Sequence, residues 1–109
     1  MYEQGDVIVV NFDPSKGHEP RKSRPAVVVS TFAFNLRSSL TYIAPITSVR
    51  SGYPLHVPIT DESAGIEGEI CVEAIAAKDL EARPSRRIGR LGLKDMDEVL
   101  NRIAPVFGL

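Results

Sequence analysis

A charged loop between two apolar runs brings together groups that can break a phosphodiester bond. His18 and Glu19 supply an imidazole and a carboxylate, and four cations lie close to them in the sequence: Lys16, Arg21, Lys22 and Arg24. The first pair suits proton transfer, and the cations suit the charge of a phosphate. Binding and catalytic residues concentrate on loops held by a rigid scaffold. The simpler interpretation is that the loop is charged only because it is solvated.

Where the phosphodiester is that of RNA, the 2′-hydroxyl of the substrate itself serves as the nucleophile. Cleavage then needs a base for that proton, an acid for the leaving 5′-oxygen and positive charge at the phosphate. The two histidines, His18 and His56, are 38 residues apart, and the sequence has no tight carboxylate cluster. We therefore expect no metal site and no cofactor.

Short apolar runs rich in β-branched and aromatic residues flank this loop and continue beyond it. They predict strands at 6–12, 25–30, 40–47, 55–60 and 69–75, with a further short strand near 87–91. Pro45 removes a backbone donor, so we expect an edge or a bulge there. Residues 31–39 fit either a loop or a short helical turn. The segment 61–68 is polar and contains glycine, as expected of a loop.

One amphipathic helix is predicted near the C-terminus. Apolar residues recur there at a spacing of three to four, forming the stripe Leu93, Met96, Val99, Leu100 and Ile103. Carboxylates in its first turns suit the helix dipole, and Pro105 and Gly108 mark its end. Five to seven short strands with one closing helix predict a mainly β fold, a small closed or partly closed barrel.

The bulk composition is that of an ordinary globular protein. The 109 residues are 43% hydrophobic and 25% charged, and we expect a single domain over 1–109. No apolar run approaches the roughly 18 residues of a membrane span. The N-terminus lacks the pattern of a signal peptide, and Cys71 is the only cysteine, so no internal disulfide can form. These features predict a cytoplasmic protein without a membrane association.

The net charge of −1 is spread unevenly along the chain. Residues 13–50 carry a balance of +4 and residues 82–109 a balance of +3, whereas 51–81 carry −6. If the fold joins the two basic segments, they form a phosphate-binding surface. The weak total charge favours a narrow groove for a short single strand over general nucleic-acid binding.

The order of residues around the loop resembles the opening of the MazF/PemK/Kid family of toxin ribonucleases. From Gly5 to Ser30 the shared pattern is Gly-Asp-Val-Ile-x-Val-x-Phe-Asp-Pro-x-Lys-Gly-x-Glu-(four residues)-Arg-Pro-Ala-Val-Val-x-Ser. It resumes at Ala44-Pro45-Ile46-Thr47-Ser48 and at Gly52-Tyr53-Pro54, and is looser beyond Gly68. The resemblance implies an SH3-like barrel with a C-terminal helix, the Kid/PemK/CcdB-like fold, assembled as a homodimer.

The same resemblance implies the toxin component of a type II toxin-antitoxin system. Such a toxin is a sequence-specific, metal-independent endoribonuclease that cleaves single-stranded RNA, including mRNA. The products would be a 2′,3′-cyclic phosphate and a 5′-hydroxyl. A small cognate antitoxin, often with an acidic tail, would be the protein partner, and DNA would be met only through that antitoxin.

Two residues lead the candidate catalytic set. The guanidinium of Arg24 can hold two phosphate oxygens, and Arg24 occupies the position of the family's catalytic arginine. The alternative is a structural arginine paired with a carboxylate such as Asp13. The hydroxyl of Thr47 can donate to a phosphate oxygen, and the resemblance places a functional threonine in this motif. Its neighbour Ser48 is a candidate RNA contact.

Glu19 and His18 compete for the proton-transfer roles that the resemblance implies. Here the match to the Kid branch weakens, because that branch carries Arg-x-Asp where this chain has Cys71-Val72-Glu73. A cysteine cannot replace the arginine, so the departure favours an Arg24/Thr47 arrangement. RNA specificity comes from stacking and from contacts to base edges. Further candidate RNA contacts are Lys16, Tyr53, His56, Glu73 and Arg83.

Two other functions stay open on the sequence. A non-enzymatic, CcdB-like toxin directed at DNA gyrase would share the fold. It relies on a Trp-Gly-x-Ile-type ending, whereas this chain has no tryptophan and ends Val106-Phe107-Gly108-Leu109. A catalytically impaired, RNA-binding relative is the second alternative, which the departure at Cys71 motivates.

Overall fold

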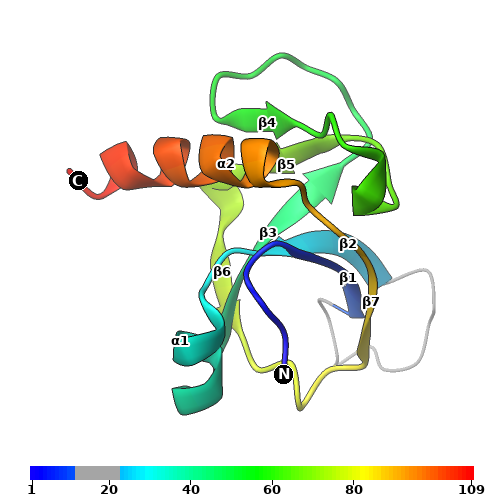
Figure 1. Cartoon of the computed structure of the whole chain (residues 1–109), viewed down its shortest axis with the longest axis vertical. Coiled ribbons are helices and arrows are strands. Elements are labelled where there is room, and N and C mark those ends of the chain that lie inside the picture. The colour runs from blue at the N-terminus through cyan, green and yellow to red at the C-terminus, as the bar shows by residue number, and fades with distance from the viewer. Residues whose placement is uncertain (12–22) are drawn as a thin grey trace.

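The described chain forms one antiparallel sheet with two α-helices, a short one after the second strand and a long C-terminal one that crosses the sheet (Figure 1). The computed structural model describes residues 1–11 and 23–109. Its strands are β1 (Asp6–Asn11), β2 (Ser23–Val28), β3 (Thr41–Thr47), β4 (His56–Pro58), β5 (Glu69–Cys71), β6 (Ala76–Lys78) and β7 (Ser85–Arg90). The helices are α1 (Phe32–Arg37) and α2 (Leu93–Val106), with 3-10 turns η3 (Glu62–Ala64) and η4 (Val72–Ala74).

The strand order is β4-β5-β3-β2-β1-β7, and β6 also pairs with β3. Strand β3 therefore changes its second neighbour along its length, from β6 at residues 41–43 to β5 at residues 46–47. Pro45 pairs with Ala26 of β2 and falls between those two neighbours. A proline is tolerated where a backbone donor has no ladder partner. Pro45 therefore lies in a central strand, at the point where one side of that strand has no paired neighbour. The expectation of an edge position at Pro45 is met locally, on that side of β3.

Two apolar cores lie on opposite faces of the central strands. Because side chains alternate along a strand, Val7, Val27 and Ala44 belong to one core, while Ile8, Ala26 and Ile43 belong to the other. The first core is closed by Met96 and Val99 of α2, and the second is bordered by Tyr2 and Leu80. Burial of both faces explains why β1, β2 and β3 read as continuous apolar runs.

The predicted apolar stripe of α2 is correct in its centre and wrong at its start. Met96 and Val99 are buried, and Leu100 and Ile103 pack against the same core. Leu93 is 84% exposed because it is the first helical residue, where the helix has not yet reached the sheet. Leu91, just before the helix, is buried in its place.

The turn η3, which connects β4 and β5, packs directly against β7. Because β4 and β7 are the first and last strands in the sheet order, this contact brings the two ends of the sheet together. Gly89 makes this approach possible, because a Cβ at that position would overlap the carbonyl group of Ala64. On the other side, the buried Asp95 of α2 accepts hydrogen bonds from the main-chain N–H and the hydroxyl of Thr60. The connection between β4 and β5 is thus held by both β7 and α2.

Most predicted elements are present with altered ends. Strand β2 begins at Ser23 instead of residue 25, and β4 and β5 are each three residues long because irregular turns follow them. The ambiguous segment 31–39 contains the helix α1, whose N-cap Thr31 accepts a hydrogen bond from Phe34 N. Within the described residues, no helix has the length and apolar character needed to cross a membrane.

Candidate active site

Arg24 and Thr47 lie on neighbouring strands at the same end of the sheet. Strands β2 and β3 pair Ala26 with Pro45, and Arg24 and Thr47 each lie two residues beyond that pair. Two residues further along a strand returns a side chain to the same face. Both residues line one cavity of about 350 Å³. Residues far apart in the sequence, and singled out separately there, therefore meet in the fold.

The hydroxyl of Thr47 has a defined orientation at the end of β3. Its Oγ1 accepts a hydrogen bond from the main-chain N–H of Val49 at 3.2 Å. A hydroxyl that accepts one bond still carries a proton to donate. Ser48 lines the same cavity, so two hydroxyl-bearing residues line it together with Arg24. The other described residues that line it are Pro25, Pro45, Ile46, Ile66 and Glu67.

The other predicted catalytic residues, His18 and Glu19, lie outside the described residues, as do Lys16 and Asp13. Arg83 is described and half-buried, and it donates a hydrogen bond to the carbonyl oxygen of Asn11 at 3.2 Å. Asn11 is the last residue of β1, which lies next to β2. The second basic segment thus approaches the strand end near Arg24, which is the condition for the two basic segments to form one phosphate-binding surface.

His56 forms the centre of a polar cluster on β4, β5 and η4, near the end of β3. Its Nδ1 lies 3.0 Å from Glu69 Oε1, and its Nε2 lies 2.9 Å from Glu73 Oε2. Tyr53 packs edge-on against the imidazole with ring centroids 5.1 Å apart. The structure therefore brings Tyr53, His56 and Glu73 together, and separates them from the cavity that Arg24 lines.

Glu69 was not singled out in the sequence, yet it organises this cluster. Glu69 is 4% exposed, and its carboxylate also accepts hydrogen bonds from the main-chain N–H groups of Ser51 and Gly52. It pairs with Thr47 across β3 and β5, which connects the cluster to the candidate catalytic residues. The alternation of Glu69, Cys71 and Glu73 with buried Ile70 and Val72 was the available indication, because it marks a polar face.

The cluster perturbs the pKa values of its members. Burial by itself lowers the pKa of His56, but the hydrogen bonds and charges of Glu73 and Glu69 outweigh it, so the pKa is raised. The hydrogen bond from His56 lowers the pKa of Glu69, against the opposing effect of burial. Burial, together with the charges of Glu73 and Glu69, raises the pKa of the Cys71 thiol. The imidazole is therefore favoured in its charged form and the thiol in its neutral form.

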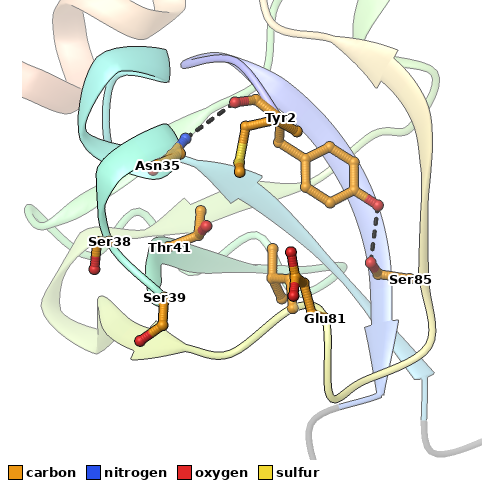
Figure 2. A pocket seen from close by; sticks show the side chains of 9 residues that line it. Tyr2, Asn35, Ser38, Ser39, Thr41, Glu81 and Ser85 are labelled. Atoms are coloured by element: carbon orange, nitrogen blue, oxygen red, sulfur yellow. Dashed lines mark hydrogen bonds between the residues drawn. The ribbon is translucent and has the colours of Figure 1, made fainter.

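A separate cavity of about 300 Å³ lies beside the N-terminus and contains none of the predicted site residues (Figure 2). Tyr2 borders it, with its hydroxyl 2.8 Å from Ser85 Oγ and its carbonyl oxygen accepting a bond from Asn35 Nδ2. Further polar side chains around it are those of Ser38 and Ser39 after α1, Thr41 at the start of β3, and Glu81 in the connection between β6 and β7 (Figure 2). None of these is among the predicted site residues, so we do not assign this cavity to the reaction.

Comparison with known proteins gives a family for this arrangement. A family model described as "PemK-like, MazF-like toxin of type II toxin-antitoxin system" matches residues 3–107. The chain belongs to this family. Endoribonuclease toxin ChpB of Escherichia coli K12 is 36% identical over 111 residues, covering 96% of this chain and 93% of the relative. Endoribonuclease toxin MazF of the same organism is 28% identical over 106 residues, with coverages of 97% and 94%.

Solved structures of PemK-like, MazF-like toxins share the fold. MazF from Deinococcus radiodurans superposes with a TM-score of 0.84 at 27% identity, covering 99% of this chain and 97% of that chain. A MazE–MazF complex from the same organism gives a TM-score of 0.84 at 23% identity, with coverages of 99% and 96%. The predicted fold class, a mainly β structure with a C-terminal helix, is confirmed.

Proposed function

We propose that this PemK-like, MazF-like toxin is a single-domain endoribonuclease that cleaves single-stranded RNA without a metal ion or cofactor. The observation that supports it is the meeting of Arg24 and Thr47 in one cavity, with Ser48 beside them. Relatives of high coverage are named endoribonuclease toxins, which agrees with an RNA substrate. Since mRNA is the expected substrate, we expect the protein to act in the cytoplasm.

In the proposed reaction, the 2′-oxygen attacks the adjacent phosphorus and the bond to the 5′-oxygen breaks. The products are a 2′,3′-cyclic phosphate and a 5′-hydroxyl. Arg24 binds two non-bridging oxygens and stabilises their charge as the phosphorus becomes pentacoordinate. The Thr47 hydroxyl donates a hydrogen bond to a phosphate oxygen, while the bond from Val49 N–H holds Oγ1 in place. His18 and Glu19 are the candidates for moving the two protons.

RNA recognition would extend from this cavity to the polar cluster around His56. Tyr53 is 47% exposed and offers a ring on which a base can stack. Ser48, His56 and Glu73 offer hydrogen-bonding groups for base edges, and Lys16 and Arg83 offer charge for the backbone. Glu69 links the two regions through its pairing with Thr47.

We further propose a two-fold homodimer that binds a small antitoxin with an acidic tail. Exposed apolar side chains near α1 and the end of α2 support a protein-covered face, among them Phe34, Leu36, Tyr42 and Phe107. An acidic tail would compete with RNA for the cations at the Arg24 cavity. Contact with DNA would occur only through the antitoxin. The solved MazE–MazF complexes are structural neighbours of this chain.

The test uses the purified protein and a long, mixed-sequence single-stranded RNA in EDTA, with mapping of cut sites and end groups. We expect cuts at one recurring short sequence that leave cyclic phosphates. Arg24→Ala should cleave about 10²–10³-fold more slowly, as expected for the loss of one transition-state donor. Arg37→Ala is the matched control, because Arg37 is an exposed arginine in α1, away from the start of β2 (Figure 1).

Each outcome separates the alternatives. Full activity of Arg24→Ala would overturn the role assigned to Arg24. Intact RNA with the parent protein would overturn the ribonuclease itself. A supercoiling assay with DNA gyrase would then test the CcdB-like alternative, and tight RNA binding without product would indicate an impaired, RNA-binding relative.

A further inference from the structure

Three potential metal ligands of three chemical types meet at the junction of β4, β5 and η4. His56, Cys71 and Glu73 each place one ligand atom within 4.8 Å of the others. They bring an imidazole nitrogen, a sulfur and a carboxylate oxygen, which are the donor types that zinc uses in proteins. Among the described residues, this is the group of metal-ligating side chains that meets that distance.

The backbone holds two of these ligands in fixed register. His56 of β4 and Cys71 of β5 are direct cross-strand partners, so their side chains project side by side on one face. Glu73 follows in η4, after buried Val72. Ligands on a paired sheet are held more precisely than ligands on a free loop. Access from solvent remains, because the Glu73 side chain is 38% exposed and the His56 side chain is 12% exposed.

Glu69 supplies the support that a metal-binding histidine normally has. Its nearly buried carboxylate lies 3.0 Å from His56 Nδ1, and main-chain N–H groups of Ser51 and Gly52 hold that carboxylate in place. A carboxylate on one ring nitrogen fixes the ring orientation and directs the other nitrogen toward a metal. In this structure the other nitrogen, Nε2, points at Glu73.

We propose that His56 Nε2, Cys71 Sγ and a Glu73 carboxylate oxygen bind one zinc-class divalent cation, with Glu69 as the positioning residue for the imidazole. Ligand nitrogen and oxygen atoms around tetrahedral zinc lie about 3.3 Å apart. The observed 2.9 Å between His56 Nε2 and Glu73 Oε2 is somewhat shorter than this, and separations within the group reach at most 4.8 Å, so rotations of the Glu73 and Cys71 side chains would complete the geometry. Three protein ligands leave a fourth position open to water.

Binding of Zn²⁺ needs a free lone pair on His56 Nε2 and the thiolate form of Cys71, so it releases the thiol proton. Two carboxylates and one thiolate then face the two positive charges of the cation. Without metal, the cluster is a histidine bridging two glutamates, and the Cys71 thiol makes a long hydrogen bond of 3.9 Å to the carbonyl oxygen of Glu69.

The test is a titration of the full chain with Co²⁺ as the probe, after EDTA treatment and its removal. We expect one equivalent to give a thiolate-to-cobalt charge-transfer band and visible bands of tetrahedral type, and one equivalent of Zn²⁺ to remove them. Cys71→Ser, a near-isosteric change, should abolish the charge-transfer band. Glu73→Gln should weaken binding at least tenfold, whereas Glu81→Gln, an exposed control, should not.

Thermal unfolding supplies a second readout that does not involve RNA cleavage. One equivalent of Zn²⁺ should raise the Tm of the parent and of Glu81→Gln, and leave that of Cys71→Ser unchanged. The proposal is overturned if micromolar Co²⁺ does not bind, if binding gives no charge-transfer band, or if Cys71→Ser binds as the parent does. Since this inference goes beyond the proposed ribonuclease, neither result changes the interpretation of the Arg24 experiment.

Discussion

The buried carboxylate of Asp95 should be one of the most important polar groups for stability. It is 2% exposed, and its two oxygens accept bonds from Thr60 N at 2.8 Å and from Thr60 Oγ1 at 2.7 Å. Hydrogen bonds to a charged group contribute about 1.5–3 kcal/mol each. Because Thr60 itself is exposed, water replaces part of that loss in a variant. We therefore expect Asp95→Ala to reduce the free energy of unfolding by about 3 kcal/mol.

Two further variants separate the contributions. Thr60→Val removes the hydroxyl and keeps the main-chain donor, so it should reduce the free energy of unfolding by about 1–1.5 kcal/mol. Asp97→Ala removes an exposed carboxylate of the same helix, and it should reduce that free energy by at most about 0.5 kcal/mol. The three losses in the free energy of unfolding distinguish two explanations. One is a specific pair of hydrogen bonds between α2 and the β4–η3 connection, and the other is a general effect of acidic residues near the start of a helix.

Equilibrium unfolding in urea measures these differences. With a slope of about 1–3 kcal/mol/M, the Asp95→Ala midpoint should fall by roughly 1–3 M with the slope unchanged. A loss no larger than that of Asp97→Ala would refute the reasoning, since the two buried bonds would then contribute nothing beyond what water provides.

Three further results are expected. Gly89→Ala should lower the Tm by about 10 °C, because the added Cβ overlaps the carbonyl group of Ala64 and overpacking of this kind costs about 2 kcal/mol; an unchanged Tm would contradict the close packing of η3 on β7. Thr47→Val should fold normally and cleave RNA about 10²-fold more slowly with little change in RNA binding, and equal loss of both would assign the hydroxyl to binding. In EDTA, the stability difference between the parent and His56→Gln should be largest between about pH 4.5 and 6.5. The raised pKa of His56 gives stabilisation that is lost as the pH rises past 6.5, and the lowered pKa of Glu69 gives stabilisation that is lost as the pH falls below 4.5; a flat difference measured across both limits would argue against the ion pairs.

The sequence predicts the sheet better than the polar cluster, for a physical reason. A continuous apolar run such as 6–11 predicts a strand that is buried on both faces. This prediction uses only neighbouring residues and does not depend on the rest of the chain. Arg24 and Thr47 were found by pattern, and their meeting in space depends on the β2–β3 register, which cannot be derived from a turn type because the connection between these strands contains α1. Leu93 shows the limit of periodicity, because a stripe does not reveal where a helix first touches the sheet.

The cluster around His56 could not be derived from spacing along the chain. The expectation of no metal site rested on the 38 residues between His18 and His56 and on the lack of a tight carboxylate cluster. Cross-strand pairing instead places His56 beside Cys71, and a single turn of 3-10 helix then brings Glu73 to the same place. The register between β4 and β5 determines this arrangement, and the long connection between the two strands gives no sequence pattern from which the register can be derived.

The pairing of β1 with β7 has a consequence for how the protein comes into being. Asp6 pairs with Arg90, which lies 84 residues later in the chain, so this pairing cannot form until β7 has been synthesised. Pairings of such high sequence separation delay folding relative to helical proteins of equal length. The inner strand β1 therefore keeps an open edge during the synthesis of every strand between β2 and β7, and the sheet is completed only when β7 has left the ribosome.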